Sequence, residues 1–206
     1  MQLLYLDVKN MNKKLYLIKI SLADAKPEIW RRFVVPSDIP LDRLHDIIQI
    51  VMGWTDSHIH EFIIAKKKYT EYPESVKDGL PCGKYRLGDL VKRKGSIIKY
   101  LYDFGDSWEH ELCIEDSGFE DQNLPSPVFC LGGARCCPPE DVGGVPGYTE
   151  FCKAMSDPFH IERNSCIEWY GGDFDSEWFE PVEINWELIK YLRWSRERSL
   201  PWDMEE

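Results

Sequence analysis

The hydrophobic period of the chain changes from strand-like to helix-like within its first third, and this change constrains the fold more than any other feature. Apolar residues occupy alternate positions in Lys14–Leu22, so one side of this segment is wholly apolar and is predicted to face a core. Pro27–Pro36 is rich in β-forming residues, which predicts a second strand paired with the first. In Leu41–Met52 apolar residues recur at helical spacing, and the flanking Pro40 and Gly53 are suited to begin and end a helix.

The rest of the chain continues with strands before it turns to helices. Residues 116–147 are rich in Pro, Gly and Asp and show no sustained hydrophobic period, so they are predicted to be largely irregular. A loop this long within a compact domain is usually functional or covers another part of the protein. Asn185 is predicted to cap the last helix. In chain order, the other predicted elements are a strand at Ile59–Ala65, a short helix around Leu87–Lys92, a hairpin at Ile97–Glu115, and helices at Tyr148–Met155, Ile161–Tyr170 and Trp186–Trp194.

The order of these elements predicts the fold class. Strands, a helix, further strands, a long loop and then helices follow one another without the regular alternation of a parallel α/β fold. We therefore expect an α+β fold with a mainly antiparallel sheet and helices packed on it. The 206 residues contain no internal repeat, low-complexity tract or linker, so a single compact domain is predicted over residues 1–206.

The hairpin is the most aromatic part of the sequence, and its register can be predicted from its two apolar faces. A three-residue loop, Gly105–Ser107, pairs Phe104 with Trp108 and Tyr102 with His110, so that apolar residues face one another across the strands. A two-residue loop would reverse one face, because side chains alternate along a strand. The three-residue loop is therefore predicted, with His110 on the apolar face.

This hairpin has a chemical interpretation and a structural one. As a site, Tyr102, Asp103, Asp106, Trp108 and His110 would bind a ligand together. As structure, the aromatic residues form a packed ladder between the strands, and the aspartates lie where turns favour aspartate. For His110 alone the structural interpretation is preferred, with the imidazole hydrogen-bonded to Tyr102 or to a backbone carbonyl.

The charge of the chain bears on its partners. A net charge of −11 repels a phosphate backbone, so nucleic-acid binding through overall charge is disfavoured. The basic runs Lys66–Lys68 and Lys92–Lys94 are interpreted as solvated loops or strand ends. No stretch approaches the roughly 20 apolar residues that span a bilayer, and no secretory signal precedes the first strand. A cytoplasmic protein without a membrane partner is expected, with its seven cysteines as free thiols.

The histidines offer a possible site for a divalent metal. His58 and His60 are two residues apart and would share one face of a strand. Together with His110 they could bind a transition metal, with Asp103 or Asp106 as a ligand or as the group that orients a ligand. The alternative is that His58 and His60 form a surface pair that caps the preceding turn.

The segment CCPPEDVGGVPGY is predicted to be a rigid acidic loop, because prolines fix its backbone and glycines permit positive φ. Glu140 and Asp141 are the candidate catalytic residues, as a base that activates metal-bound water. Cys137 is a candidate binding residue in the same loop. The alternative is that the two carboxylates cap the loop or the helix that follows it.

Motifs of the common enzyme classes are absent from the sequence. It contains neither GxGxxG nor GxxxxGK[ST], and it contains neither a GxSxG elbow nor an HExxH helix. Signals for nucleotide-dependent enzymes, standard serine hydrolases and zinc proteases of that type are therefore missing.

Five stretches of the sequence together resemble one family. In chain order they are PEIWRRFVVP, LDRLHDIIQIVMGWTDSHIHEF, YDFGDSWEHEL, CPPEDVGGVPGY and WYGGDFDSEWF. They resemble the motifs of the plasmid pRiA ORF-three-like family over residues 14–192. The resemblance implies a single α+β domain of a prokaryotic protein, and some relatives are carried on plasmids or insertion elements. It implies no established biochemical activity.

Three functional hypotheses follow. The preferred one is a binding or interaction module for a protein or peptide, because the chain is acidic, has 13% aromatic residues and lacks every strong catalytic pattern. The alternative is a metal-dependent hydrolase or nuclease that uses the His/Asp cluster. A nucleic-acid surface around Lys92–Lys99 is a third hypothesis, against which the net charge weighs. The sequence is thus compatible with an enzyme and with a non-enzyme.

Overall fold

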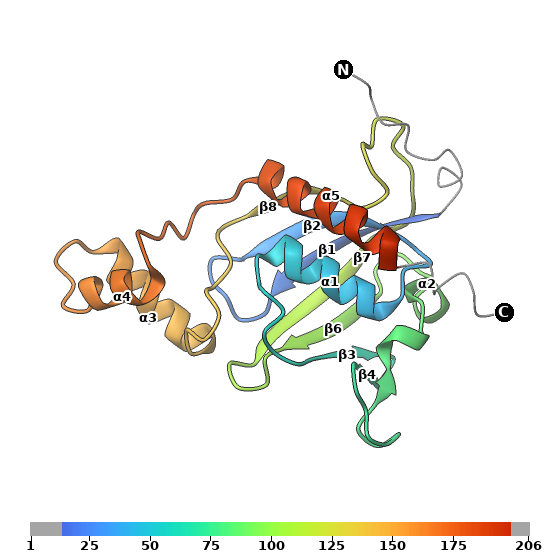
Figure 1. Ribbon diagram of the computed structural model, residues 1–206, viewed down its shortest axis with the longest axis horizontal. Helices are drawn as coiled ribbons and strands as arrows, with labels where there is room; N and C mark the ends of the chain where they lie inside the picture. The colour runs from blue at the N-terminus through green and yellow to red at the C-terminus, as the bar shows by residue number, and fades with distance from the viewer. Residues whose placement is uncertain (1–13, 199–206) are drawn as a thin grey trace.

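The computed structural model describes residues 14–198 and is built on one eight-stranded sheet (Figure 1). The strand order is β5-β4-β3-β6-β7-β1-β2-β8, and every pair except the parallel β4–β5 pair is antiparallel in the described part of the chain. The strands are β1 Leu15–Leu22, β2 Trp30–Pro36, β3 His60–Ile64, β4 Lys67–Thr70, β5 Leu80–Pro81, β6 Ile97–Tyr102, β7 Trp108–Phe119 and β8 Phe129–Ala134.

The helices divide into two groups. α1 contacts β2, and α5 contacts both α1 and β8, so these two helices lie together against the sheet. α3 and α4 contact each other and lie to one side of the sheet, at the left of Figure 1. The helices are α1 Leu41–Met52, α2 Leu87–Leu90, α3 Gly144–Ser156, α4 Arg163–Tyr170 and α5 Pro181–Arg198, and Cys82–Lys84 forms the 3-10 turn η2. None of the helices within residues 14–198 has the length and apolar character to cross a membrane.

The predicted fold class is confirmed: the fold is α+β, with a mainly antiparallel sheet and helices packed on it. β1 alternates as predicted, with its side chains from Tyr16 to Leu22 buried at every second position. α1 has the predicted bounds, and Gly53 ends it in the left-handed region at φ 101°, where its N–H donates to the Gln49 carbonyl at 2.8 Å. Local period and capping residues therefore determined these elements.

The predicted register of the hairpin is wrong by two residues. Tyr102 pairs with Trp108 and Tyr100 pairs with His110, so the loop has five residues, Asp103–Ser107. Strand β6 ends early because Asp103 adopts positive φ at 55° and its Oδ1 accepts a hydrogen bond from the Gly105 N–H at 2.8 Å. A shift of two residues preserves the faces of the strand, so Trp108 and His110 are still buried.

The prediction that residues 116–147 are irregular is wrong at both ends and in the middle. β7 continues to Phe119, α3 begins at Gly144, and β8 pairs with β2. The sequence of β8, FCLGGA, contains two glycines and therefore shows little alternation. A short outer strand of this composition has no period that could be detected.

Asn185 does not cap the last helix, which begins four residues earlier at Pro181. Instead, the carboxylate of Glu180 accepts a hydrogen bond from the Val182 N–H at 2.9 Å, at the N-terminal end of the helix. The Asn185 side chain donates to the Cys130 carbonyl at 2.9 Å and accepts from the Cys130 N–H at 2.8 Å. Asn185 therefore joins α5 to the backbone of β8.

Candidate functional site

Three loops meet at one end of the sheet and contain most of the predicted site residues. They follow α1, connect β6 to β7, and precede α3; we call them the loop cluster, residues 54–59, 103–107 and 138–143. The indole N–H of Trp54 donates to the Pro138 carbonyl at 3.0 Å. The Gly143 N–H donates to Asp106 Oδ2 at 3.0 Å. Hydrogen bonds therefore tie the third loop to each of the other two.

Glu140 is the centre of the hydrogen bonds in the loop cluster. Its carboxylate accepts from the Tyr102 hydroxyl at 2.5 Å, and from the backbone N–H of Thr55 at 3.3 Å and the Thr55 hydroxyl. Burial alone would raise the pKa of Glu140, but the hydrogen bonds from Thr55 and Tyr102 outweigh it and lower that pKa. A general base works best with a pKa near the working pH, so these contacts suit Glu140 to positioning the loops more than to the predicted base role.

Tyr102 connects Glu140 to the loop that follows α1. Its hydroxyl accepts a hydrogen bond from the Ser57 N–H at 3.0 Å while donating to Glu140. Burial, and then the neighbouring Glu140 carboxylate, raise the pKa of Tyr102 above its usual value. Tyr102 therefore remains a neutral hydrogen-bond donor in the structure.

His58, Asp103 and Asp141 come together at the surface of the loop cluster. His58 Nε2 lies 3.4 Å from Asp141 Oδ1 and 3.7 Å from Asp103 Oδ2. The three ligand atoms lie within 4.8 Å of one another. The side chain of Asp103 is 10% exposed and that of Asp141 is 73% exposed, so the group lies between core and solvent.

His60 and His110 lie in the core below this group. His60 stacks on His45 with 3.5 Å between the ring centroids, and His110 Nδ1 lies 2.9 Å from the Trp108 carbonyl oxygen. Burial lowers the pKa of His60 to about 3, with a smaller contribution from His45, and burial lowers the pKa of His110 to about 3 as well. His110 is the core histidine bonded to a backbone carbonyl that the structural interpretation predicted.

The structure does not bring the three histidines of the predicted metal site together. Among residues 14–198, the groups whose ligand atoms converge are His58–Asp103–Asp141 and His45–Asp46–Asp56. Neither group contains His60 or His110. Of the predicted ligands, His58 and Asp103 therefore meet, and their third neighbour is Asp141.

His45 was not predicted as a site residue, although it lies within the helical apolar pattern. Its Nδ1 lies 2.8 Å from the Tyr100 hydroxyl and its Nε2 lies 2.7 Å from Asp56 Oδ1. Gln49, one turn later on α1, donates to the same Tyr100 hydroxyl at 3.0 Å. The i, i+4 spacing of two polar residues on an apolar face was the available signal.

The remaining predicted binding residues have structural contacts. Trp108 is fully buried, and Cys137 is 9% exposed in the same core. Burial raises the pKa of Cys137, so it is a protonated thiol and not a reactive thiolate. Asp106 fixes Gly143, as described above. Among the predicted site residues, the His58 group is therefore where converging side chains reach the surface.

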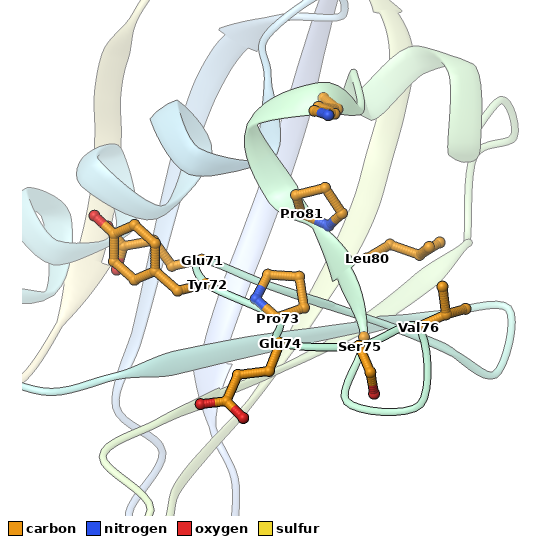
Figure 2. Close-up of a pocket in the computed structure, with 10 residues that line it drawn as sticks. Glu71, Tyr72, Pro73, Glu74, Ser75, Val76, Leu80 and Pro81 are labelled. Carbon is orange, nitrogen blue, oxygen red and sulfur yellow. The ribbon is translucent and has the colours of Figure 1, made fainter.

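A separate hollow is lined by the segment that connects β4 to β5, by β5 itself and by Lys84, and it holds none of the predicted site residues. Its volume is about 640 Å³, and Pro73 and Pro81 lie near its centre with Val76 and Leu80 to one side (Figure 2). It is lined by Glu71, Tyr72, Pro73, Glu74, Ser75, Val76, Gly79, Leu80, Pro81 and Lys84. None of its lining residues belongs to the loop cluster.

A second candidate surface lies on α5, which has apolar side chains on two sides. Leu188 is 1% exposed on the side that packs on the core. On the other side Val182, Trp186 and Ile189 are 60%, 60% and 40% exposed. Their i, i+4, i+7 spacing places them in one row along the helix. We call these three residues the α5 outer stripe.

The part of the chain from the end of α3 to the middle of α5 is strongly acidic. Residues 157–190 contain nine acidic and two basic side chains, so this sixth of the chain has most of its net negative charge. Glu183 and Glu187 lie beside the stripe on α5, and both are exposed. The surface therefore combines apolar side chains with flanking carboxylates.

Three comparisons relate the chain to known proteins. Residues 14–183 of this chain match the family described as plasmid pRiA4b ORF-3-like protein. The uncharacterized protein y4hQ of Sinorhizobium fredii is 40% identical over 171 residues, which are 77% of this chain and 82% of that protein. The crystal structure of a protein of unknown function, MM3350 from Methanosarcina mazei Go1, has a TM-score of 0.75 at 33% identity, over 83% of this chain and 97% of that chain. The fold is therefore shared with a solved structure.

Proposed function

This chain belongs to the plasmid pRiA4b ORF-3-like protein family, as its motifs predicted, and we propose that it is a binding module whose α5 outer stripe receives a segment of a partner protein. The observation that carries the proposal is that α5 is apolar on two sides while only one side is covered by the described residues, 14–198. A helix that is apolar on both sides is normally buried on both. The uncovered side is therefore suited to a partner.

The composition of the stripe supports protein recognition. Tryptophan is enriched among residues that dominate binding energy, and Trp186 lies at the middle of the row, between Val182 and Ile189. Truncating such an anchor commonly costs about 2 kcal/mol or more of binding free energy. The stripe therefore has the arrangement of a central anchor with smaller apolar neighbours.

The charge around the stripe specifies the chemistry of the partner. The Glu183 carboxylate favours a segment whose apolar face is flanked by lysine or arginine, while the neighbouring Glu187 is already ion-paired with Lys190 at 2.6 Å. A second copy of the chain would bring like charges together at this surface, which disfavours self-association. The same charge repels nucleic acid. We therefore infer that the partner segment which binds the stripe is a basic amphipathic helix. We propose that this binding takes place in the cytoplasm, where the seven free cysteines would stay reduced.

The proposal is tested with two helical peptides that share a leucine face and differ in their flanking charges, lysine in one and glutamate in the other. We expect the lysine peptide to bind the full chain, by fluorescence anisotropy of the labelled peptide, with an affinity that falls as salt rises. Binding should weaken at least about ten-fold in Trp186→Ala, which corresponds to 1.4 kcal/mol. Val76→Ala is the matched control, because Val76 is 83% exposed in the β4–β5 region.

Several results would contradict the proposal. Equal binding of both peptides, or unchanged binding in Trp186→Ala, would show that the stripe does not recognise a basic segment. A dimer in sedimentation that dissociates in Trp186→Ala would show that a second copy occupies the stripe.

Metal-dependent hydrolysis is a second candidate function, and the convergence of His58, Asp103 and Asp141 favours it. Three protein ligands leave room for a water molecule, which a bound metal would activate. The assay uses an activated phosphodiester and an activated ester, each with Zn²⁺ or Mn²⁺ added. Turnover that disappears in His58→Ala would support this function, and an absence of turnover with every metal would reject it.

A further inference from the structure

We propose that His58, Asp103 and Asp141 bind a divalent first-row transition metal ion, for which Zn²⁺ is the best fit. The three side chains come from the three different loops of the loop cluster, and their ligand atoms lie within 4.8 Å of one another. This ligand set differs from a site of three histidines, because two of those histidines are buried in the core. It also does not depend on the α5 outer stripe.

The distances within the group fit adjacent ligands of one ion better than hydrogen bonds. His58 Nε2 lies 3.4 Å from Asp141 Oδ1 and 3.7 Å from Asp103 Oδ2, whereas N–H···O hydrogen bonds seldom exceed about 3.2 Å. Zinc–nitrogen and zinc–oxygen bonds of about 2.1 Å at tetrahedral angles place neighbouring ligand atoms about 3.4 Å apart. The two separations measured from His58 are therefore compatible with neighbouring ligands of one ion.

One nitrogen of the group, His58 Nε2, points into it without a hydrogen bond. His58 Nε2 is buried from solvent and has no hydrogen-bond partner. The side chain of Asp103 is nine-tenths buried, and its Oδ1 accepts from the Gly105 N–H at 2.8 Å, so Oδ2 is the atom that faces His58. Buried polar atoms normally have a partner. A metal ion between His58 and Asp103 would supply the partner that His58 Nε2 lacks.

The backbone and the neighbouring side chains hold the ligands in place. The Asp103 N–H donates to the Ile59 carbonyl at 3.0 Å, which ties this ligand to the residue after His58. The His58 ring meets the Tyr102 ring edge-on, with 5.8 Å between the centroids. Asp141 follows Glu140, which is fixed by Thr55 and Tyr102. Ligands held in this way lose little conformational entropy when an ion binds.

The donor atoms select the class of metal. Two carboxylates and one neutral imidazole carry a charge of −2, which a divalent cation neutralises. Imidazole suits zinc, cobalt and other transition metals, whereas calcium and magnesium prefer a shell of oxygen atoms. Three protein ligands leave a fourth position of a tetrahedral zinc ion open to water or to a ligand.

The other converging group, His45–Asp46–Asp56, does not share these features. Both ring nitrogens of His45 already have hydrogen-bond partners, Tyr100 on one side and Asp56 on the other. Asp46 accepts a hydrogen bond from the Tyr191 hydroxyl at 2.6 Å. The His58 group is therefore the better cation site of the two.

The site is tested by titrating the untagged full chain with Co²⁺ and recording its visible absorption. We expect one Co²⁺ per chain, with the intense d–d bands of a low-coordinate site and no thiolate-to-cobalt charge-transfer band. His58→Ala and Asp141→Asn should each weaken binding at least about ten-fold, since even changes around metal ligands cost that much. His160→Ala is the matched control: it removes a histidine that lies in the segment before α4, and it should bind as the parent chain does.

Thermal unfolding and circular dichroism establish that each variant is folded before it is titrated. An absence of stoichiometric binding, a thiolate charge-transfer band, or unchanged binding in both ligand variants would overturn the proposal. Asp56→Asn distinguishes the two converging groups, because loss of binding in that variant alone would assign the metal to His45 instead. None of these variants alters α5, so the result is independent of peptide binding at the outer stripe.

Discussion

His45 and His60 stack face to face in the core, with ring centroids 3.5 Å apart and an angle of 9° between the ring planes. His45 reaches this position from α1 and His60 from β3. Two parallel imidazoles in contact cannot both carry a charge without strong repulsion, and burial adds to that cost. The stack therefore makes the junction of helix and sheet sensitive to acid.

We expect the free energy of unfolding to fall as the pH is lowered from 6.5 towards 5. The pKa values of His60 and His110 are lowered to about 3 in the folded chain, whereas the unfolded histidines titrate near 6.5. The unfolded state therefore binds more protons in this window, and each histidine contributes about 1.4 kcal/mol per pH unit. Urea unfolding at pH 7, 6 and 5 measures the slope.

The matched comparison for this pH effect uses two histidine variants. His110→Gln should make the unfolding free energy depend less on pH, by about 1.4 kcal/mol per pH unit, because it removes one buried histidine that takes up a proton on unfolding. His160→Gln should leave the slope unchanged, since His160 lies outside the core. A slope that is the same in all three proteins would contradict the role of the buried histidines.

Gly144→Ala is expected to destabilise the chain much more than Gly95→Ala. Both glycines have positive φ, 67° and 80°, so alanine costs about 1 kcal/mol at either position. A Cβ at Gly144 would also lie 2.5 Å from the Asp106 carbonyl oxygen, whereas a Cβ at Gly95 would have no atom within 4 Å. Chemical denaturation of both variants gives the difference, and equal losses would show that the loops do not approach closely.

Asn185→Ala should lower the free energy of unfolding by about 1–3 kcal/mol, because it removes the partners of the Cys130 N–H and carbonyl. Asn123→Ala provides the control, since Asn123 is exposed in the loop before β8. Urea denaturation compares the two variants. An effect of Asn185→Ala no larger than that of the control would mean that water replaces the lost contacts.

Leu188→Ala and Trp186→Ala are expected to separate folding from recognition on α5. Leu188 is 1% exposed, so its truncation should cost about 2–5 kcal/mol of stability. Trp186 is 60% exposed, and its truncation should change stability by less than about 1 kcal/mol. Thermal unfolding of both variants measures this, and a large loss in Trp186→Ala would show that the stripe belongs to the fold itself.

The sequence predicted those elements that are specified by local period and capping. α1 is the best example, because a regular apolar pattern and Gly53 define it without reference to distant residues. The register of the hairpin could not be predicted, since it depends on the Asx turn at Asp103 and on the hydrogen bond between its N–H and the Ile59 carbonyl. Face alternation alone permits any shift by two residues.

The sequence predicted which residues could form a candidate site, but not which of them lie together in the structure. His58, Asp103 and Asp141 were each noted for their chemistry, yet only the meeting of three loops shows that they belong together. His60 was grouped with His58 because alternation places both on one face of a strand. β3 begins at His60, so His58 lies in the preceding loop and is free to turn away.

The contact between Asn185 and Cys130 has a further consequence for how the chain behaves at high concentration. β8 is an outermost strand, and such strands expose N–H and carbonyl groups to which another chain can add. The Asn185 side chain is hydrogen-bonded to both the N–H and the carbonyl of Cys130 in β8. At the opposite edge of the sheet, β5 has only two residues and ends in Pro81, which has no N–H. Both borders of the sheet are therefore poor templates for strand addition, which protects the protein against β-aggregation.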